Sequence, residues 1–254
     1  MAEEVCPDCG GSGWKIVERD GISGAERCEC AKEGRSGRLE EVAGIPPLYR
    51  NASFESFQSP KDNDIAARDL DAIRLDVMKY VAEFPAGLKR GLLLIGDPGT
   101  GKTHLAVAAL RRIIAKGFQG VFFDYQNLLD RIRSGFDATS GSSDREAYRD
   151  ALDAEVLMLD DLGAHRVLPW IEDVVTSIIT QRCNHRKALI ATTNLPDVDA
   201  GDRVSQKLPD GTIDYRRTLA DHIGQRARSR LFEMCKVVHM PLVRDYRLRK
   251  TTAW

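Results

Sequence analysis

An apolar run that leads directly into a glycine-rich loop constrains the fold of this 254-residue chain more than any other segment. Residues 91–95 read Gly-Leu-Leu-Leu-Ile, and residues 96–103 match the pattern GxxxxGK[ST], where x is any residue. This order predicts a buried strand, a phosphate-binding loop and a helix over 103–115. Because glycines adopt backbone angles closed to other residues, successive amides can turn toward phosphate oxygens at the start of that helix, whose dipole favours negative charge. The residues expected to hold the phosphates are Gly96, Asp97, Pro98, Gly99, Thr100, Gly101, Lys102 and Thr103.

The last two residues of the loop indicate what it binds. The amine of Lys102 can reach the outer phosphates of a nucleoside triphosphate, and the hydroxyl of Thr103 can bind Mg²⁺. A glycine turn that only joins a strand to a helix requires neither side chain. We therefore expect ATP and Mg²⁺ as cofactors.

Apolar runs alternate with helical patterns along the rest of the chain. Strands are expected at 91–95, 121–124, 156–159, 188–192 and 237–240. Helices are expected between them at 103–115, 127–133, 170–183 and 219–233. Because such alternation produces a parallel sheet with both faces covered, we predict a three-layer α/β/α domain with a five-stranded parallel sheet. The polar stretches 134–144 and 196–215 should be loops.

Two carboxylates follow the run at 156–159. Asp160 and Asp161 would lie at the carboxyl edge of the sheet, where ligands bind in folds of this type. Asp160 is expected to bind Mg²⁺ together with Thr103, and Asp161 to polarise the attacking water as general base. The alternative is an ordinary polar strand end in which Asp161 caps a turn. The phosphate loop upstream favours the catalytic interpretation.

Three further polar residues are candidates for the same site. Asn194 follows the strand at 188–192 and can orient water or contact the γ-phosphate, unless it only forms a turn before Pro196. Arg226 and Arg230 lie four residues apart and hence on one face of a helix. A guanidinium from this face, delivered to ATP on a neighbouring subunit, would stabilise transition-state charge. Considered alone, these arginines would be interpreted as a solvated surface.

Four of the six cysteines form two close pairs near the N-terminus. Cys6 and Cys9 precede a polar segment of hairpin length, and Cys28 and Cys30 follow it. Such pairs suit a structural, tetrahedral Zn²⁺ thiolate site, with a redox pair or an Fe–S cluster as alternatives. The metal would supply the folding energy that a segment so poor in apolar residues lacks. The other two cysteines are expected in the core: Cys183 and Cys235.

Overall charge gives no indication of a partner. Lys plus Arg number 37 against 38 Asp plus Glu, so the net charge of −1 attracts neither nucleic acid nor an acidic membrane. Between 216 and 250 basic residues outnumber acidic ones, which suits either a DNA backbone or contacts between subunits. No apolar stretch is long enough for a bilayer and no secretory leader is recognisable, so we expect a cytoplasmic protein with no membrane partner.

Taken in order, these motifs resemble the AAA+ ATPases, and more narrowly the DnaC/DnaI/IstB-like group of replicative helicase loaders and transposition helpers. Residues 96–106 are similar to the phosphate loop and following helix of that group, which adds His104 to the nucleotide-binding residues. Residues 159–163, Leu-Asp-Asp-Leu-Gly, resemble its variant of the acidic strand end. Residues 192–194 resemble sensor 1, and Ser229-Arg230 resembles the box VII arginine finger.

The resemblance covers roughly residues 44–248 and carries expectations about partners. It implies an N-terminal arm that contacts a ring helicase, an ATPase domain that binds single-stranded DNA, and an ATP-bound homo-oligomer shaped as an open ring or spiral. Residues 44–54 resemble the segment that leads into the domain near the adenine. The sequence after 245–247 leaves no room for a full C-terminal helical lid, so a sensor 2 role is not expected for Arg247.

We therefore expect a zinc-ribbon-like module over 1–34, a linker and lead-in segment over 35–50, and an AAA+ ATPase domain over 51–254. The expected function is that of an ATP-dependent helicase loader for DNA replication, which binds the replicative helicase and single-stranded DNA and hydrolyses ATP. One alternative is an IstB-like transposition helper that acts with a transposase on duplex DNA. A second is a nucleotide-gated adaptor with negligible turnover.

Overall fold

The computed structural model describes residues 6–9, 12, 14–19, 22–60, 62–135, 142–165, 168–198, 205–207 and 213–250. Within these residues, one parallel sheet has the strand order β4-β5-β6-β3-β9. Its strands are β3 (Gly91–Ile95), β4 (Gly120–Asp124), β5 (Val156–Asp160), β6 (Ala188–Thr193) and β9 (Cys235–His239). The predicted five-stranded parallel sheet is confirmed.

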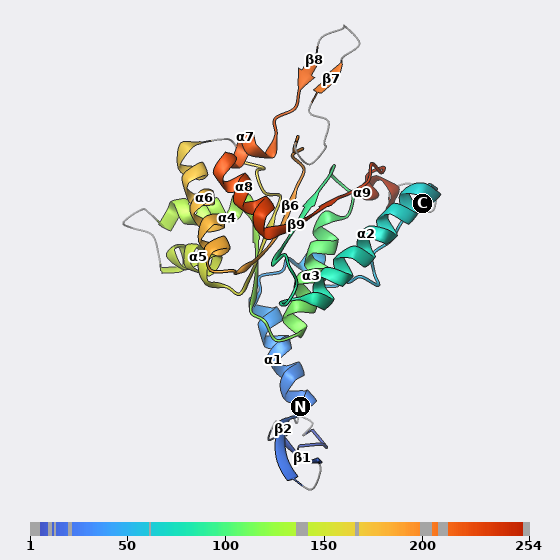
Figure 1. Ribbon diagram of the computed structural model, residues 1–254, viewed down its shortest axis with the longest axis vertical. Helices are drawn as coiled ribbons and strands as arrows, with labels where there is room; N and C mark the ends of the chain where they lie inside the picture. Colours follow the sequence, from blue (N-terminus) through green and yellow to red (C-terminus); the bar gives the residue numbers. More distant parts are fainter. Residues whose placement is uncertain are drawn as a thin grey trace.

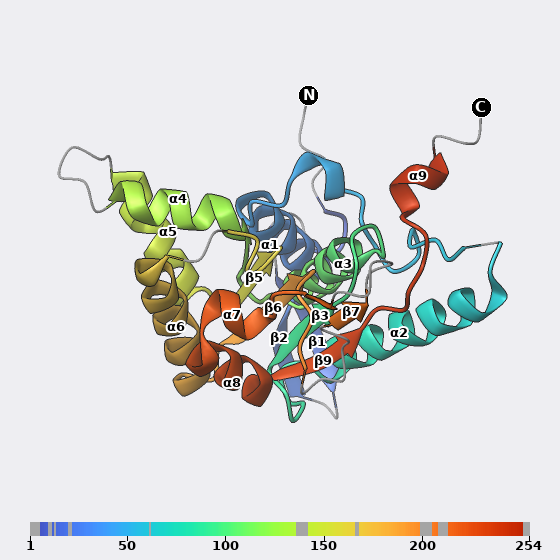
Figure 2. The same ribbon diagram turned by 90° about the horizontal axis from the view of Figure 1, so that it is seen from above.

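Helices cover both faces of this sheet, which Figures 1 and 2 show from two directions. One face carries α2 (Asp64–Glu83) and α3 (Lys102–Ala115). The other carries α4 (Tyr125–Gly135), α5 (Ser142–Asp153), α6 (Pro169–Asn184), α7 (Leu219–Ile223) and α8 (Gln225–Met234). Side chains of β3 alternate between the two cores: Leu92 and Leu94 pack toward α3, whereas Leu93 and Ile95 pack toward α6. The three-layer arrangement is thus confirmed.

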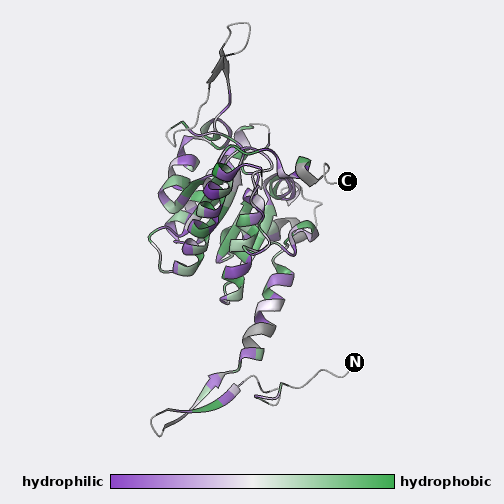
Figure 3. Cartoon of the chain, turned by 90° about the vertical axis from the view of Figure 1, so that its right-hand side faces the viewer, coloured by the Kyte–Doolittle hydropathy of each residue, from purple (hydrophilic) through white to green (hydrophobic). Residues whose placement is uncertain are grey.

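The N-terminal part is a hairpin followed by a long helix. Strands β1 (Trp14–Arg19) and β2 (Ile22–Arg27) pair antiparallel, and α1 (Glu29–Val42) connects them to the main domain (Figure 1). The sequence predicted the end of the zinc module and, from residue 35, a linker in this region. The structure has a continuous helix, and Figure 3 shows that it is more hydrophilic than the strands of the main domain.

Two contacts anchor the C-terminal end of α1 to the main domain. Arg111 Nε of α3 lies 2.6 Å from Glu40 Oε1, and the amide of Phe122 in β4 donates to the carbonyl of Ala43 at 2.7 Å. These contacts join α1 to both the helix after the phosphate loop and an edge strand of the sheet.

Several further elements differ from expectation. Helices α2 and α5 were not predicted, and the helix expected at 219–233 is interrupted at Gly224. Gly224 has a φ of 81°, and a Cβ there would lie 2.3 Å from Glu172 Oε1, so the break needs glycine. The stretch 196–215 includes strands β7 (Ser205–Lys207) and β8 (Ile213–Tyr215), an antiparallel pair that extends from the domain (Figure 1). Of the loop expected at 134–144, residues 134–135 belong to α4 and residues 142–144 to α5, whereas residues 136–141 lie outside the described part.

The two cysteines expected in the core differ in burial. Cys235 is buried as predicted, whereas Cys183 is only partly buried. Among the residues that the structure describes, no helix combines the length and apolar character needed to cross a bilayer.

A buried arginine joins the layer of α5 and α6 to the sheet. Arg182 of α6 is fully buried, and its guanidinium donates to the carbonyls of Ala151 at 2.8 Å and Ala154 at 3.0 Å, and to that of Ala188. Burial lowers the pKa of Arg182 to about 9, so the group remains charged at neutral pH. The arginine therefore satisfies carbonyls at the end of α5 and at the start of β6.

We expect Arg182→Leu to lower the free energy of unfolding by roughly 3 kcal/mol or more, because several buried carbonyls would lose their donor. Urea denaturation followed by circular dichroism measures this change. Arg149→Leu on the exposed face of α5 is the matched control and should cost no more than about 0.5 kcal/mol. Equal losses in the two variants would contradict the role given to Arg182.

Candidate functional site

The phosphate loop has the shape that its sequence predicts. Gly99 and Gly101 have φ angles of 75° and 94°, in the left-handed region that favours glycine. Gly101 caps the N-terminus of α3, and a Cβ there would lie 2.6 Å from the ring of Phe57. The backbone thus turns directly into the helix whose N-terminal amides and dipole suit an anion.

Lys102 is buried at the base of this loop. Its side chain reaches back, and Nζ donates to the carbonyl of Asp97 at 2.9 Å. Burial lowers the pKa of Lys102 to about 8, although the charges of Asp161 and Asp160 favour the protonated amine. The amine is therefore held inside the loop and lacks a full counter-charge until an anion binds.

The affinity for MgATP should fall as the pH rises above about 8. Below that pH Lys102 is protonated in the free and bound states, whereas above it binding must take up a proton, because bound phosphates favour the charged amine. The decline should approach tenfold per pH unit. Titration with a fluorescent adenine nucleotide between about pH 7 and pH 9.5 measures it.

Lys102→Arg is the control for this pH profile, because a guanidinium stays charged throughout that range. Whatever its absolute affinity, this variant should lack the decline. A wild-type affinity that is constant across the range would contradict the prediction.

The two predicted Mg²⁺ ligands lie side by side. Asp160 ends β5 and is largely buried, and the hydroxyl of Thr103 donates to its Oδ1 at 2.9 Å. Burial raises the pKa of Asp160, although its hydrogen bonds from Thr192 and Thr103 oppose that change. A carboxylate and a hydroxyl at one point are oxygen donors of the kind Mg²⁺ prefers, so this pair fits the expected ion.

Asp161 and Asn194 also meet at this edge of the sheet. The amide nitrogen of Asn194 donates to Asp161 Oδ1 at 3.2 Å. Asp161 has a φ of 54°, which is uncommon for a residue with a side chain and is often found at functional sites. This hydrogen bond directs the Asp161 carboxylate toward Asn194, the residue that follows β6.

Thr192 is a residue of this site to which the sequence gave no separate role. Thr192 is fully buried, and its hydroxyl donates to Asp160 Oδ1 at 2.7 Å. The hydroxyl oxygen of Thr192 also accepts the amide proton of Asp161 at 2.9 Å. One hydroxyl thus holds both acidic residues. Its signal in the sequence is weak, because the contact depends on the register between β5 and β6.

We expect Thr192→Val to reduce ATP turnover roughly 10- to 100-fold, the usual cost of losing a hydrogen bond that orients a metal ligand. The Mg²⁺ concentration needed for half-maximal turnover should rise, while nucleotide binding without hydrolysis should change little. Thr192→Ser keeps the hydroxyl and should retain most activity. A Val variant with normal Mg²⁺ dependence would be inconsistent with this role.

The segment after β9 lies against the phosphate loop. The amide of Tyr246 donates to the carbonyl of Gly99 at 3.1 Å, and its hydroxyl donates to Gln58 Oε1 at 3.1 Å. Tyr246 opens the short helix α9 (Tyr246–Lys250). The charge of neighbouring Arg247 also contributes to lowering the pKa of Lys102. Although the sequence gave no reason to expect Arg247 here, the structure brings its charge to the nucleotide site.

His104 contacts the segment that leads into the domain. Its Nε2 lies 2.8 Å from the carbonyl oxygen of Ser53 and 3.2 Å from Ser56 Oγ, and its ring meets that of Phe57 edge-on. The hydroxyl of Tyr49 in the same segment has a raised pKa, chiefly through burial and then through the charge of Asp160. His104 thus connects the lead-in segment to α3, and Tyr49 brings that segment to the acidic pair.

The two candidate arginines lie elsewhere in the same chain. Arg226 and Arg230 line a polar groove between α6 and α8, and the described residues that line it include none from the phosphate loop. Arg230 donates to Glu233 Oε2 at 2.7 Å, and this contact raises its pKa. Within one chain, therefore, these guanidinium groups do not belong to the nucleotide site.

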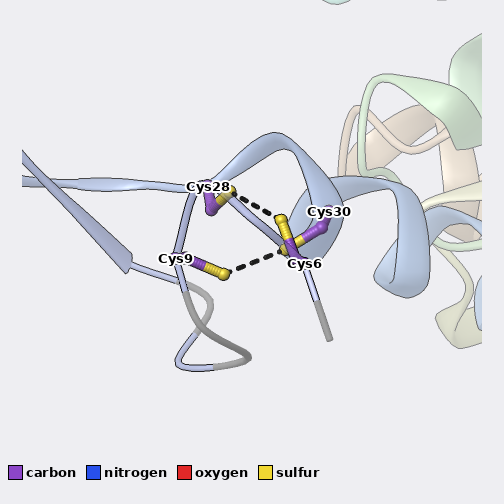
Figure 4. A group of neighbouring side chains, drawn as sticks. All are labelled: Cys6, Cys9, Cys28 and Cys30. Carbon is purple, nitrogen blue, oxygen red and sulfur yellow. Dashed lines mark hydrogen bonds between the residues drawn. The ribbon is translucent and has the colours of Figure 1, made fainter. Parts of the chain in front are cut away.

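The four N-terminal cysteines converge on one point (Figure 4). Their sulfur atoms all lie within 4.8 Å of one another, with Cys6 and Cys28 3.8 Å apart and Cys9 and Cys30 3.4 Å apart. Cys28 caps α1, and Cys30 lies in its first turn. Four convergent thiols fit tetrahedral Zn²⁺. Gly10, Gly11 and Gly13, which flank this site in the sequence, lie outside the described residues.

The purified protein should contain about one zinc ion per chain, which a colorimetric chelator assay detects after denaturation. Removal of the metal should reduce the helical signal in circular dichroism, because the cluster fixes the start of α1. Cys28→Ser should lose the ion, and Cys183→Ser should keep it. Visible absorbance from iron would instead favour an Fe–S cluster.

The fold and the site together define a P-loop nucleotide-binding protein of the α/β/α type. Comparison with known proteins supports a narrower assignment. The profile of the family described as "IstB-like ATP binding protein" matches residues 33–210, and the chain belongs to this family. The protein is therefore an ATP-binding AAA+ ATPase.

Individual relatives agree with this assignment. The "Replicative helicase loader DnaC" of Escherichia coli (strain K12) is 23% identical over 184 residues, which are 70% of this chain and 72% of that protein. YqaM of Bacillus subtilis (strain 168) is 27% identical over 227 residues, which are 84% of this chain and 68% of that protein. A crystal structure of the DnaC helicase loader superposes with a TM-score of 0.61 at 28% identity, covering 77% of this chain and 100% of that one.

Proposed function

We propose that this chain is an ATP-driven loader of a replicative DNA helicase. The contact of Thr103 and Thr192 with a single oxygen of Asp160 carries this proposal, because it joins the phosphate loop to the acidic strand end in the form that hydrolysis requires. The choice of a helicase as partner is supported by the similarity to proteins named as helicase loaders.

In this proposal, each residue at the carboxyl edge of the sheet has one role in ATP hydrolysis. Lys102 and the loop amides hold the phosphates, and Thr103 and Asp160 are the Mg²⁺ ligands. When bound, Mg²⁺ would neutralise charge on the β- and γ-phosphates. Asp161 accepts a proton from the attacking water, and Asn194, hydrogen-bonded to it, orients that water.

The arginines act on a second copy of the chain. Arg226 and Arg230 lie in a groove without phosphate-loop residues, so we assign them to ATP held by a neighbour in an open ring or spiral. The oligomer binds single-stranded DNA. Several basic residues between 216 and 250 also form ion pairs with acidic residues of the same chain, among them Arg216, Arg228, Arg230 and Lys236.

The cysteine module is the arm that contacts the helicase. Cys6, Cys9, Cys28 and Cys30 would hold Zn²⁺, and the metal would give the hairpin of β1 and β2 a fixed shape. Helix α1 then places this hairpin away from the sheet (Figure 1). We place the protein in the cytoplasm, where the replicative helicase acts.

A sizing column with the cognate replicative helicase tests the proposal. The chain and the helicase should elute as one complex in ATP, and the complex should dissociate as ATP is hydrolysed. Asp161→Asn should form the complex and fail to release it. Absence of any complex in ATP would rule out a loader.

The alternative is a transposition helper, which the family match keeps open. Preference for duplex over single-stranded DNA, together with co-purification of a transposase, would select it. Complex formation that is indifferent to Asp161→Asn would instead indicate a nucleotide-gated adaptor.

A further inference from the structure

A buried ion pair joins the loop after β6 to helix α8. Arg228 Nε lies 2.8 Å from Asp197 Oδ2, and a second guanidinium nitrogen lies 2.5 Å from Oδ1. The side chains of Asp197 and Arg228 are only 3% and 14% exposed. The ring of Phe232 lies against the guanidinium, 4.1 Å from its carbon. Two parallel hydrogen bonds in a buried setting fix both distance and orientation.

One end of this pair is attached to the nucleotide site. Only Leu195 and Pro196 separate Asn194 from Asp197, and the proline ring fixes one backbone angle of this short connection. The hydroxyl of Thr193 donates to the carbonyl of Leu162 at 2.8 Å, and the carbonyl of Pro196 accepts the first amide of α7 at 3.0 Å. A shift of Asn194 would therefore be passed to Asp197.

The other end sets the rotation of α8 about its axis. Successive residues of a helix are separated by about 100°, so Arg228 points about 160° away from Arg226 and Arg230, which lie two residues to either side. Arg228 faces the buried carboxylate, and the two outer arginines line the groove with α6. A change in the buried contact would turn the outer pair.

We propose that Asp197 and Arg228 are positioning residues that orient Arg226 and Arg230 according to the state of the chain's own Asn194. The pair links the nucleotide site of one chain to the arginines that the same chain presents to its neighbour. This inference rests on the proposed action of Arg226 and Arg230 in trans.

Arg228→Lys tests the link with little risk to the fold, since it keeps the charge opposite Asp197 but loses the two-pronged contact. We expect at least tenfold lower turnover, nucleotide affinity within about twofold of wild type, and a similar unfolding midpoint. The second variant combines Asp197→Asn with Arg228→Gln and so removes both charges. It should show the same changes in turnover, nucleotide affinity and unfolding midpoint as Arg228→Lys. Arg112→Lys, in an exposed ion pair with Glu55, is the control and should leave turnover unchanged.

Mixing variants shows on which nucleotide site the pair acts. Arg228→Lys retains an intact phosphate loop, and Asp161→Asn retains ATP binding and intact arginines. Equal mixing should restore turnover several-fold above that of either protein alone, because arginines of the second chain reach ATP held by the first. The reference mixture combines Arg226→Ala/Arg230→Ala with Asp161→Asn and should recover similarly.

Three results would overturn the inference. Normal ATP turnover in Arg228→Lys would show that the pair does not link the nucleotide site to Arg226 and Arg230. Recovery in the reference mixture but not in the Arg228→Lys mixture means that the pair serves its own nucleotide site. No recovery in the reference mixture refutes the trans action of the arginines, and this inference fails with that part of the proposed function.

Discussion

One oxygen of the Asp160 carboxylate accepts hydrogen bonds from two elements that are distant in sequence, and the geometry of the nucleotide site depends on it. Thr103 belongs to the helix after the phosphate loop, and Thr192 belongs to the strand between β5 and β3. The same strand is tied to the loop, because the amide of Gly96 donates to the carbonyl of Thr193 at 3.2 Å. The loop and the acidic strand end are thus fixed to one another by the protein alone, and binding of ATP need not assemble them.

Much of this architecture could be read from the sequence, because the relevant patterns are local. The loop at 96–103, the acids after β5 and the polar residues after β6 each follow an apolar run, and a parallel sheet places such strand ends together. The cysteine pairs were likewise recognisable from their spacing. In these cases a short segment already contains the residues that act together.

The remainder depends on contacts between distant segments or on weak local signals. Thr192 contacts Asp160 only because of strand register, and the contact of Tyr246 with Gly99 joins residues almost 150 positions apart. Helix α1 contains two glycines, which lower its intrinsic propensity. Helix α2 does carry a local signal, since Asn63 caps it by accepting the amide proton of Ala66.

The near-zero net charge conceals a specific internal use of charge. Arg182 binds backbone carbonyls inside the domain, Arg228 binds a buried carboxylate, and Lys102 stays buried in the loop. Each cation lies where a neutral side chain would leave an oxygen or an anion without a partner. Composition alone cannot distinguish these cations from those that face solvent.

Helix α1 has mechanical consequences, because it is held at both ends. Its first turn belongs to the cysteine cluster, whereas its last turns contact Arg111 of α3 and the edge strand β4. With 14 residues it spans about 21 Å and forms a rigid connection between the two. A force applied to the hairpin is therefore transmitted along the whole length of α1 to α3, the helix that starts at Lys102.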